Sequence, residues 1–75
     1  MTGACIVRNP KILGGKPTIE GTRISAELVL RALANGMSEG EIREQWPTIP
    51  QGGVAACLAY AADLVENDRS WAESA

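Results

Sequence analysis

Residues 9–24 constrain the fold of this chain more than any other segment, because they concentrate glycine and proline. The stretch reads NPKILGGKPTIEGTRI and holds three glycines and two prolines. Glycine permits positive φ angles, whereas proline fixes φ and removes a backbone donor. The stretch is therefore predicted to form tight turns and short extended pieces.

Two β-prone pieces are expected in the N-terminal part, at residues 6–7 and 18–19. Residues 22–24 could pair with the second piece across a turn that uses Gly21 at positive φ. Such short strands are not stable by themselves. We expect them to lie against helices, or to pair with a second copy of themselves.

Two helices are predicted next from their capping residues. Ser25 is a suitable N-cap for the first helix, and Gly36 is placed to end it in a left-handed conformation. Ser38 and Glu41 have the spacing of a capping box for the second helix. Pro47 prevents that helix from continuing.

A third helix is predicted over residues 50–67, with Pro50 in its first turn, where the missing N–H costs nothing. Its expected core stripe consists of Val54, Cys57, Leu58, Ala61, Leu64 and Val65. Residues 54–62 carry no charged side chain, and a helix that is apolar nearly all round is buried on more than one side. In so short a chain the second side is predicted to meet another copy. The candidate dimer contacts are Ala55, Ala59, Tyr60 and Ala62.

These elements predict one mainly α-helical domain. It comprises a Gly/Pro-rich β extension over residues 1–24, a three-helix bundle over 25–67 and a polar tail over 68–75. The second and third helices, with the first packed across them, have the outline of a helix-turn-helix.

Charge is distributed unevenly along the chain. Residues 1–37 hold five basic and two acidic side chains, whereas residues 38–75 hold two basic and seven acidic ones. The basic front could meet an anion such as nucleic acid, and the acidic rear a basic protein, although small proteins also scatter charge by chance. The candidate phosphate contacts are Arg8, Lys11, Lys16 and Arg23. Alternatively, Lys16 and Arg23 tie the β extension to the helix ends.

The residues for catalysis are missing. The chain has no histidine, and Cys5 and Cys57 have no base to activate them. Gly14-Gly15-Lys16 does not fit a phosphate-binding loop, since Pro17 follows the lysine and proline replaces the first glycine of the motif. We therefore expect no enzyme, no cofactor and no metal.

Location is predicted from the same absences. There is no secretory h-region and no apolar run long enough to span a bilayer, so a cytoplasmic protein is expected. In that compartment the two cysteines are expected to be reduced, although a disulfide between them remains an alternative.

One longer pattern is specific. The run GGKPTIEGTRI at residues 14–24, followed by GMS at 36–38, EI at 41–42, WP at 46–47 and AYA at 59–61, closely resembles a bacterial and archaeal family known as domain of unknown function four-three-three. The resemblance covers most of the chain. It implies a homeodomain-like three-helix fold with an N-terminal β extension.

The resemblance also implies a function. It points to a VapB-like antitoxin of a type II toxin–antitoxin pair, whose usual partner is a PIN-like ribonuclease toxin. Such antitoxins commonly form homodimers and repress their own operon by binding operator DNA. Because a carboxylate tail can mimic phosphate near basic residues, the candidate toxin contacts are Glu66, Asp68, Trp71 and Glu73. A repressor that acts without a toxin, and a dimerisation module that contacts only protein, remain alternatives.

Overall fold

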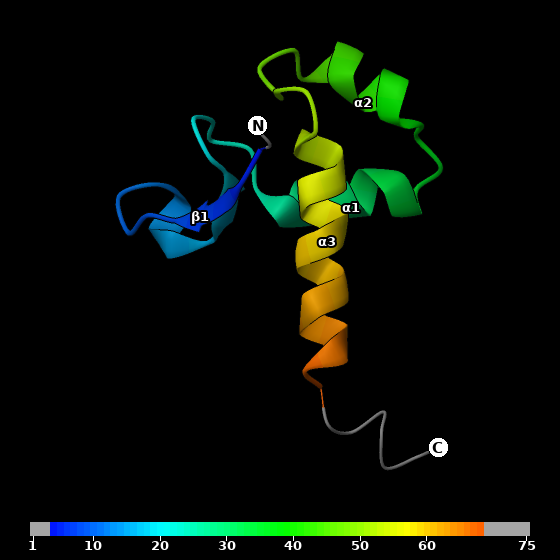
Figure 1. The fold of residues 1–75 in the computed structure, drawn as a ribbon. Helices are drawn as coiled ribbons and strands as arrows, with labels where there is room; N and C mark the ends of the chain where they lie inside the picture. The colour runs from blue at the N-terminus through cyan, green and yellow to red at the C-terminus, as the bar shows by residue number, and fades with distance from the viewer. Residues whose placement is uncertain (1–3, 69–75) are drawn as a thin grey trace, which may run out of the picture.

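The protein folds into three helices preceded by a short two-stranded sheet (Figure 1). The structure is a computed structural model, and it describes residues 4–68. The elements in chain order are β1 (Ile6–Arg8), a 3₁₀ turn (Leu13–Gly15), β2 (Pro17–Ile19), α1 (Ala26–Ala34), α2 (Glu39–Gln45) and α3 (Gly53–Glu66). The predicted mainly α architecture with an N-terminal β extension is therefore confirmed.

The two strands pair with each other in an antiparallel sheet, with Ile6 opposite Ile19 and Arg8 opposite Pro17. They need no second copy for this pairing. The predicted pairing of residues 22–24 with β2 is reduced to two backbone hydrogen bonds and a single bridge next to them. The Ile19 N–H donates to the Ile24 carbonyl and the Thr22 N–H donates to the Ile19 carbonyl, both at 3.0 Å. Gly21 has φ +84°, which confirms its predicted place in the turn.

Local sequence determines both ends of α1 and the start of α2. The Ser25 hydroxyl accepts a hydrogen bond from the Leu28 N–H. At the other end of α1, Gly36 has φ +96°, and the Met37 N–H bonds back to the Ala32 carbonyl in a Schellman motif. The capping box of α2 is also present: the Ser38 side chain accepts a hydrogen bond from the Glu41 N–H, and the Glu41 side chain accepts one from the Ser38 N–H.

The start of α3 differs from the prediction. The helix begins at Gly53, three residues later than expected, and Pro50 lies in a turn before it. The Gly53 N–H donates to the Pro50 carbonyl at 2.9 Å, and Gly52 has φ +83°. A Cβ on Gly53 would stand 2.7 Å from Cγ2 of Ile49. Gly52 and Gly53 thus allow this tight turn and close packing.

The core lies where the sheet, α1 and α2 meet the first turns of α3. It is formed by Ile19, Ile24, Ala26, Val29, Ala32, Ile42, Ile49, Val54 and Cys57. Thr18 is also fully buried, and its hydroxyl hydrogen-bonds to the Val7 carbonyl. Figure 1 shows why the core ends there: α3 continues past α1 and the sheet, away from the rest of the domain.

The predicted core stripe of α3 is therefore wrong in its second half. Leu58, Leu64 and Val65 are 49%, 56% and 62% exposed, respectively. Only Val54 and Cys57 of the predicted stripe are buried. Periodicity identified the apolar side chains correctly, but the domain is too short to cover the outer turns of this helix.

Candidate functional site: a groove between the sheet, α1 and α3

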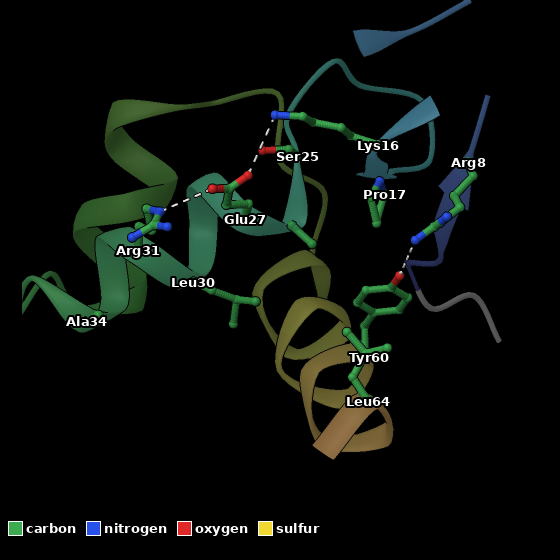
Figure 2. A pocket seen from close by; sticks show the side chains of 11 residues that line it. Arg8, Lys16, Pro17, Ser25, Glu27, Leu30, Arg31, Ala34, Tyr60 and Leu64 are labelled. Carbon is green, nitrogen blue, oxygen red and sulfur yellow. Dashed lines mark hydrogen bonds and ion pairs between the residues drawn. The ribbon is translucent and has the colours of Figure 1, made fainter. Parts of the chain in front are cut away.

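A groove of about 420 Å³ separates the sheet from α1 and α3. Its apolar lining comes from all three elements, with Pro17 on β2, Leu30 and Ala34 on α1, and Tyr60 and Leu64 on α3. Figure 2 shows the Leu30 side chain reaching from α1 toward α3. We call this feature the β–α groove. Apolar walls with a few polar groups at the edge are typical of binding sites.

Three cations stand at the edge of the β–α groove (Figure 2). On one side, Glu27 lies between Lys16 and Arg31, at 3.7 Å from the Lys16 Nζ and 3.2 Å from the Arg31 Nε. On the other side, the Arg8 guanidinium donates a hydrogen bond to the Tyr60 hydroxyl at 3.3 Å. One carboxylate is thus shared by two cations, and the edge keeps an excess of positive charge.

Two of the four predicted phosphate contacts meet at this groove, and the other two do not. Arg8 and Lys16 both line it, whereas Arg23 lines a separate hollow of about 870 Å³ beside Leu28 and Trp46. Lys11 is exposed in the turn after β1. The ion pair from Lys16 to α1 is the contact expected if this lysine ties the β extension to the helices.

The candidate dimer residues divide between two sides of α3. Ala55, Ala59 and Ala62 are exposed, and their helical spacing places them on one side of α3, away from buried Cys57. Tyr60 is half-buried and points instead to the β–α groove. The dimer itself stays a prediction.

Sequence reasoning missed two exposed residues at the margin of that side, between the alanines and buried Val54. Leu58 and Val65 fall beside the three alanines at helical spacing and are exposed. Together they form what we call the outer stripe, made of Ala55, Leu58, Ala59, Ala62 and Val65. The lack of charged side chains over residues 54–62 indicated an apolar surface on this helix, but the sequence analysis assigned Leu58 and Val65 to the core.

The predicted toxin contacts lie at the far end of α3. Glu66 is the last residue of the helix and is exposed, and Asp68 follows shortly after it. Trp71 and Glu73 lie outside the described residues. The sequence prediction also missed Leu30 and Arg31 as groove residues, because their proximity to α3 depends on how the helices pack.

The two cysteines are free thiols in different surroundings. Cys5 is exposed, whereas Cys57 is fully buried. Burial raises the pKa of the Cys57 thiol above its ordinary value, which makes it a poorer nucleophile at neutral pH. Within residues 4–68 there is no group of three or more metal-ligating side chains, and no helix there could cross a membrane.

Comparison with known families shows to which family the chain belongs. Residues 6–61, which include both strands and most of α3, match the model of the family described as "Protein of unknown function (DUF433)". The chain belongs to this family. Its match runs from the sheet through Tyr60, so most of the β–α groove lies within the family domain.

The chain is also similar to part of a longer protein. The chain is 32% identical over 56 residues to "Uncharacterized protein y4eO" of Sinorhizobium fredii. That match covers 75% of this chain and 25% of the relative, so the chain spans about a quarter of the relative's length. No solved structure matches the chain.

Proposed function

We propose that this DUF433 protein is the antitoxin of a type II toxin–antitoxin pair, which neutralises a PIN-like ribonuclease by direct binding and represses its own operon. The observation that carries the proposal is the outer half of α3. Leu58, Leu64 and Val65 are 49%, 56% and 62% exposed on a helix that extends beyond the domain. An apolar surface of this kind is typical of protein–protein contact.

Charge supports the same partner class. The acidic residues Glu66 and Asp68 follow directly on the apolar outer half of α3. A ribonuclease must attract RNA phosphate, so its active-site cleft carries positive charge or metal ions. Carboxylates presented beside an apolar helix face can occupy such a cleft, and thereby exclude RNA.

The test begins with the product of the adjacent reading frame. The two proteins are co-expressed and their complex is isolated by size-exclusion chromatography with light scattering. We expect a stable complex, rescue of growth from the toxic partner, and inhibition of its RNA cleavage. A product of the adjacent reading frame that neither binds this protein nor cleaves RNA would contradict the proposal.

A matched pair of variants then locates the contact. Changing Glu66→Gln and Asp68→Asn together is expected to weaken binding of the partner by about ten-fold or more, as loss of charge-assisted contacts does. The control changes Glu39→Gln and Glu44→Gln, two exposed carboxylates on α2. Equal affinity of both double variants would show that the end of α3 is not the contact.

A second candidate function is a DNA-binding repressor that acts without a toxin. It is favoured by the position of Arg8 and Lys16 together at the β–α groove. Binding to the protein's own upstream DNA should then fall steeply with salt concentration, and Lys16→Ala should reduce the salt dependence. Binding that is absent or insensitive to salt would exclude this function.

A further inference from the structure

The β–α groove has a polar pair on its strand side, Arg8 and Tyr60, whose hydrogen-bonding capacity the fold does not exhaust. The Arg8 guanidinium donates one hydrogen bond, to the Tyr60 hydroxyl at 3.3 Å. Within residues 4–68, no carboxylate forms an ion pair with Arg8. A guanidinium has five N–H donors, and a hydroxyl that accepts a hydrogen bond can still donate its own hydrogen. Arg8 and Tyr60 can therefore donate together to one carboxylate.

The rest of the groove favours an apolar group. The apolar side chains that line it are Pro17, Leu30, Ala34 and Leu64. Figure 2 shows Leu30 reaching from α1 toward α3, on the other side of the groove from the polar pair. Leu64 is 56% exposed. A ligand in the groove would therefore cover apolar surface that the fold leaves in water, which favours its binding.

The remaining charges select the sign of the ligand. Lys16 and Arg31 share the Glu27 carboxylate, at 3.7 Å and 3.2 Å respectively. With Arg8, the groove thus has three cations and one carboxylate, and its excess positive charge attracts an anion. A nucleic-acid phosphate would use this charge but leave the apolar lining uncovered. A carboxylate carried on an apolar chain uses both features.

The groove lies on a different side of α3 from the predicted dimer contacts. Tyr60 and Leu64 line it one helical turn apart, whereas Ala55 and Ala62 fall on the opposite side of the helix. A dimer formed through the outer stripe would therefore leave the groove open. Its volume of about 420 Å³ lies within the range of small-molecule sites.

We propose that the β–α groove binds a small amphiphilic carboxylate. Its carboxylate accepts hydrogen bonds from Arg8 and Tyr60, and its apolar chain lies against Leu30 and Leu64. This inference does not depend on the antitoxin proposal. Because Arg8 is also a candidate phosphate contact, a bound carboxylate and a nucleic-acid phosphate would exclude each other at this residue.

The test uses octanoate as the probe, titrated into the full chain and followed by NMR spectroscopy. We expect saturable shifts of the Leu30 and Leu64 methyl resonances, while those of Leu58 on the outer stripe stay unchanged. Octan-1-ol, which lacks the charge, and acetate, which lacks the chain, should each bind about ten-fold more weakly or less. Equal affinity for octanoate and either reference compound would overturn the proposal. So would shifts of Leu58 equal to those of Leu30, or no saturable binding at millimolar octanoate.

Matched variants test the polar pair. Arg8→Gln should weaken octanoate binding by about ten-fold or more, because it removes the charge-assisted contact. Tyr60→Phe keeps the ring and removes the hydroxyl, and should weaken binding by about three- to ten-fold. The control is Arg43→Gln, at an exposed arginine of α2 that does not line the groove, and it should leave the affinity unchanged. Equal effects of both arginine variants would overturn the proposal. Displacement of octanoate by an equal concentration of inorganic phosphate would do the same, since it would show a site that recognises charge alone.

Discussion

Helices α1 and α3 show two ways in which the same chain uses apolar residues. In α1 the apolar positions Ala26, Val29 and Ala32 are buried, and the outer side carries the ion pair of Glu27 with Arg31. In α3 the buried positions stop at Cys57, and the outer side remains apolar. Apart from Leu28, which is 37% exposed, the large apolar side chains of α1 are covered within the domain, whereas those in the outer half of α3 are not.

The difference indicates that α1 and α3 differ in how much of their surface must be covered by other parts of a protein. A polar outer face keeps an amphipathic helix in solution, so α1 needs no contact beyond its own core. The outer stripe of α3 exposes Leu58 and Val65, and no charged residue precedes Asp63 in this helix. Its composition suits a second protein surface, which is why both the dimer and the toxin proposals involve this helix.

The largest expected effect compares one buried residue of α1 with one exposed residue of α3. Val29→Ala should lower the free energy of unfolding by about 2 kcal/mol, because it removes two methyl groups from a fully buried site. Leu58→Ala at a half-exposed site should cost less than about 1 kcal/mol in the monomer. Urea denaturation at low protein concentration measures both, and equal losses would contradict the comparison.

The next effect concerns the two ends of α3. Gly53→Ala should destabilise the protein by about 1–2 kcal/mol, since the new Cβ would stand 2.7 Å from Ile49 at the covered end of the helix. The matched control is Gly40→Ala in α2, where the nearest atom is 3.9 Å away. That change should stabilise the protein by about 0.5 kcal/mol. A gain from Gly53→Ala would show that the covered end is loosely packed.

Capping should distinguish α1 from α3 by a smaller amount. Ser25→Ala removes the side-chain cap of α1 and should cost about 1 kcal/mol in thermal or urea unfolding. The N-cap of α3 is Gly52, which has no side chain to lose. A stability unchanged by Ser25→Ala would mean that the start of α1 is held by the β2 contact instead.

The smallest effect comes from the buried thiol of α3. Because burial raises the pKa of Cys57, the folded state keeps its proton at a pH where the unfolded chain has lost it. The free energy of unfolding should therefore fall as the pH rises above 9.0, the ordinary pKa of a cysteine thiol. Cys57→Ala should remove this part of the pH dependence, whereas Cys5→Ala should keep it.

The sequence predicted α1 and α2 well because their limits are set by neighbouring residues. Ser25, Gly36 and the pair of Ser38 and Glu41 each act within one helical turn. The start of α3 was missed because Pro50 suits a first helical turn equally well, and the true start depends on the packing of Gly53 against Ile49. Local signals do not report such contacts.

The β–α groove could not be predicted from neighbouring residues either, because it is formed by segments that are far apart in the sequence. Arg8 and Lys16 could be named as candidates from their charge, but their meeting with Tyr60 and Glu27 joins segments far apart in the sequence. The exposure of Leu58 and Val65 likewise depends on where the domain ends, which periodicity does not reveal.

The most direct test of the half-covered α3 is the mass of the protein in solution. Sedimentation equilibrium at micromolar concentrations should give a homodimer for the natural chain and a folded monomer for Ala59→Glu, which places a charge in the middle of the outer stripe. Arg43→Glu, a change at an exposed site on α2, is the control and should remain a dimer. A natural chain that stays monomeric at these concentrations, or a dimer unaffected by Ala59→Glu, would contradict the account of α3 as a helix completed by a second copy.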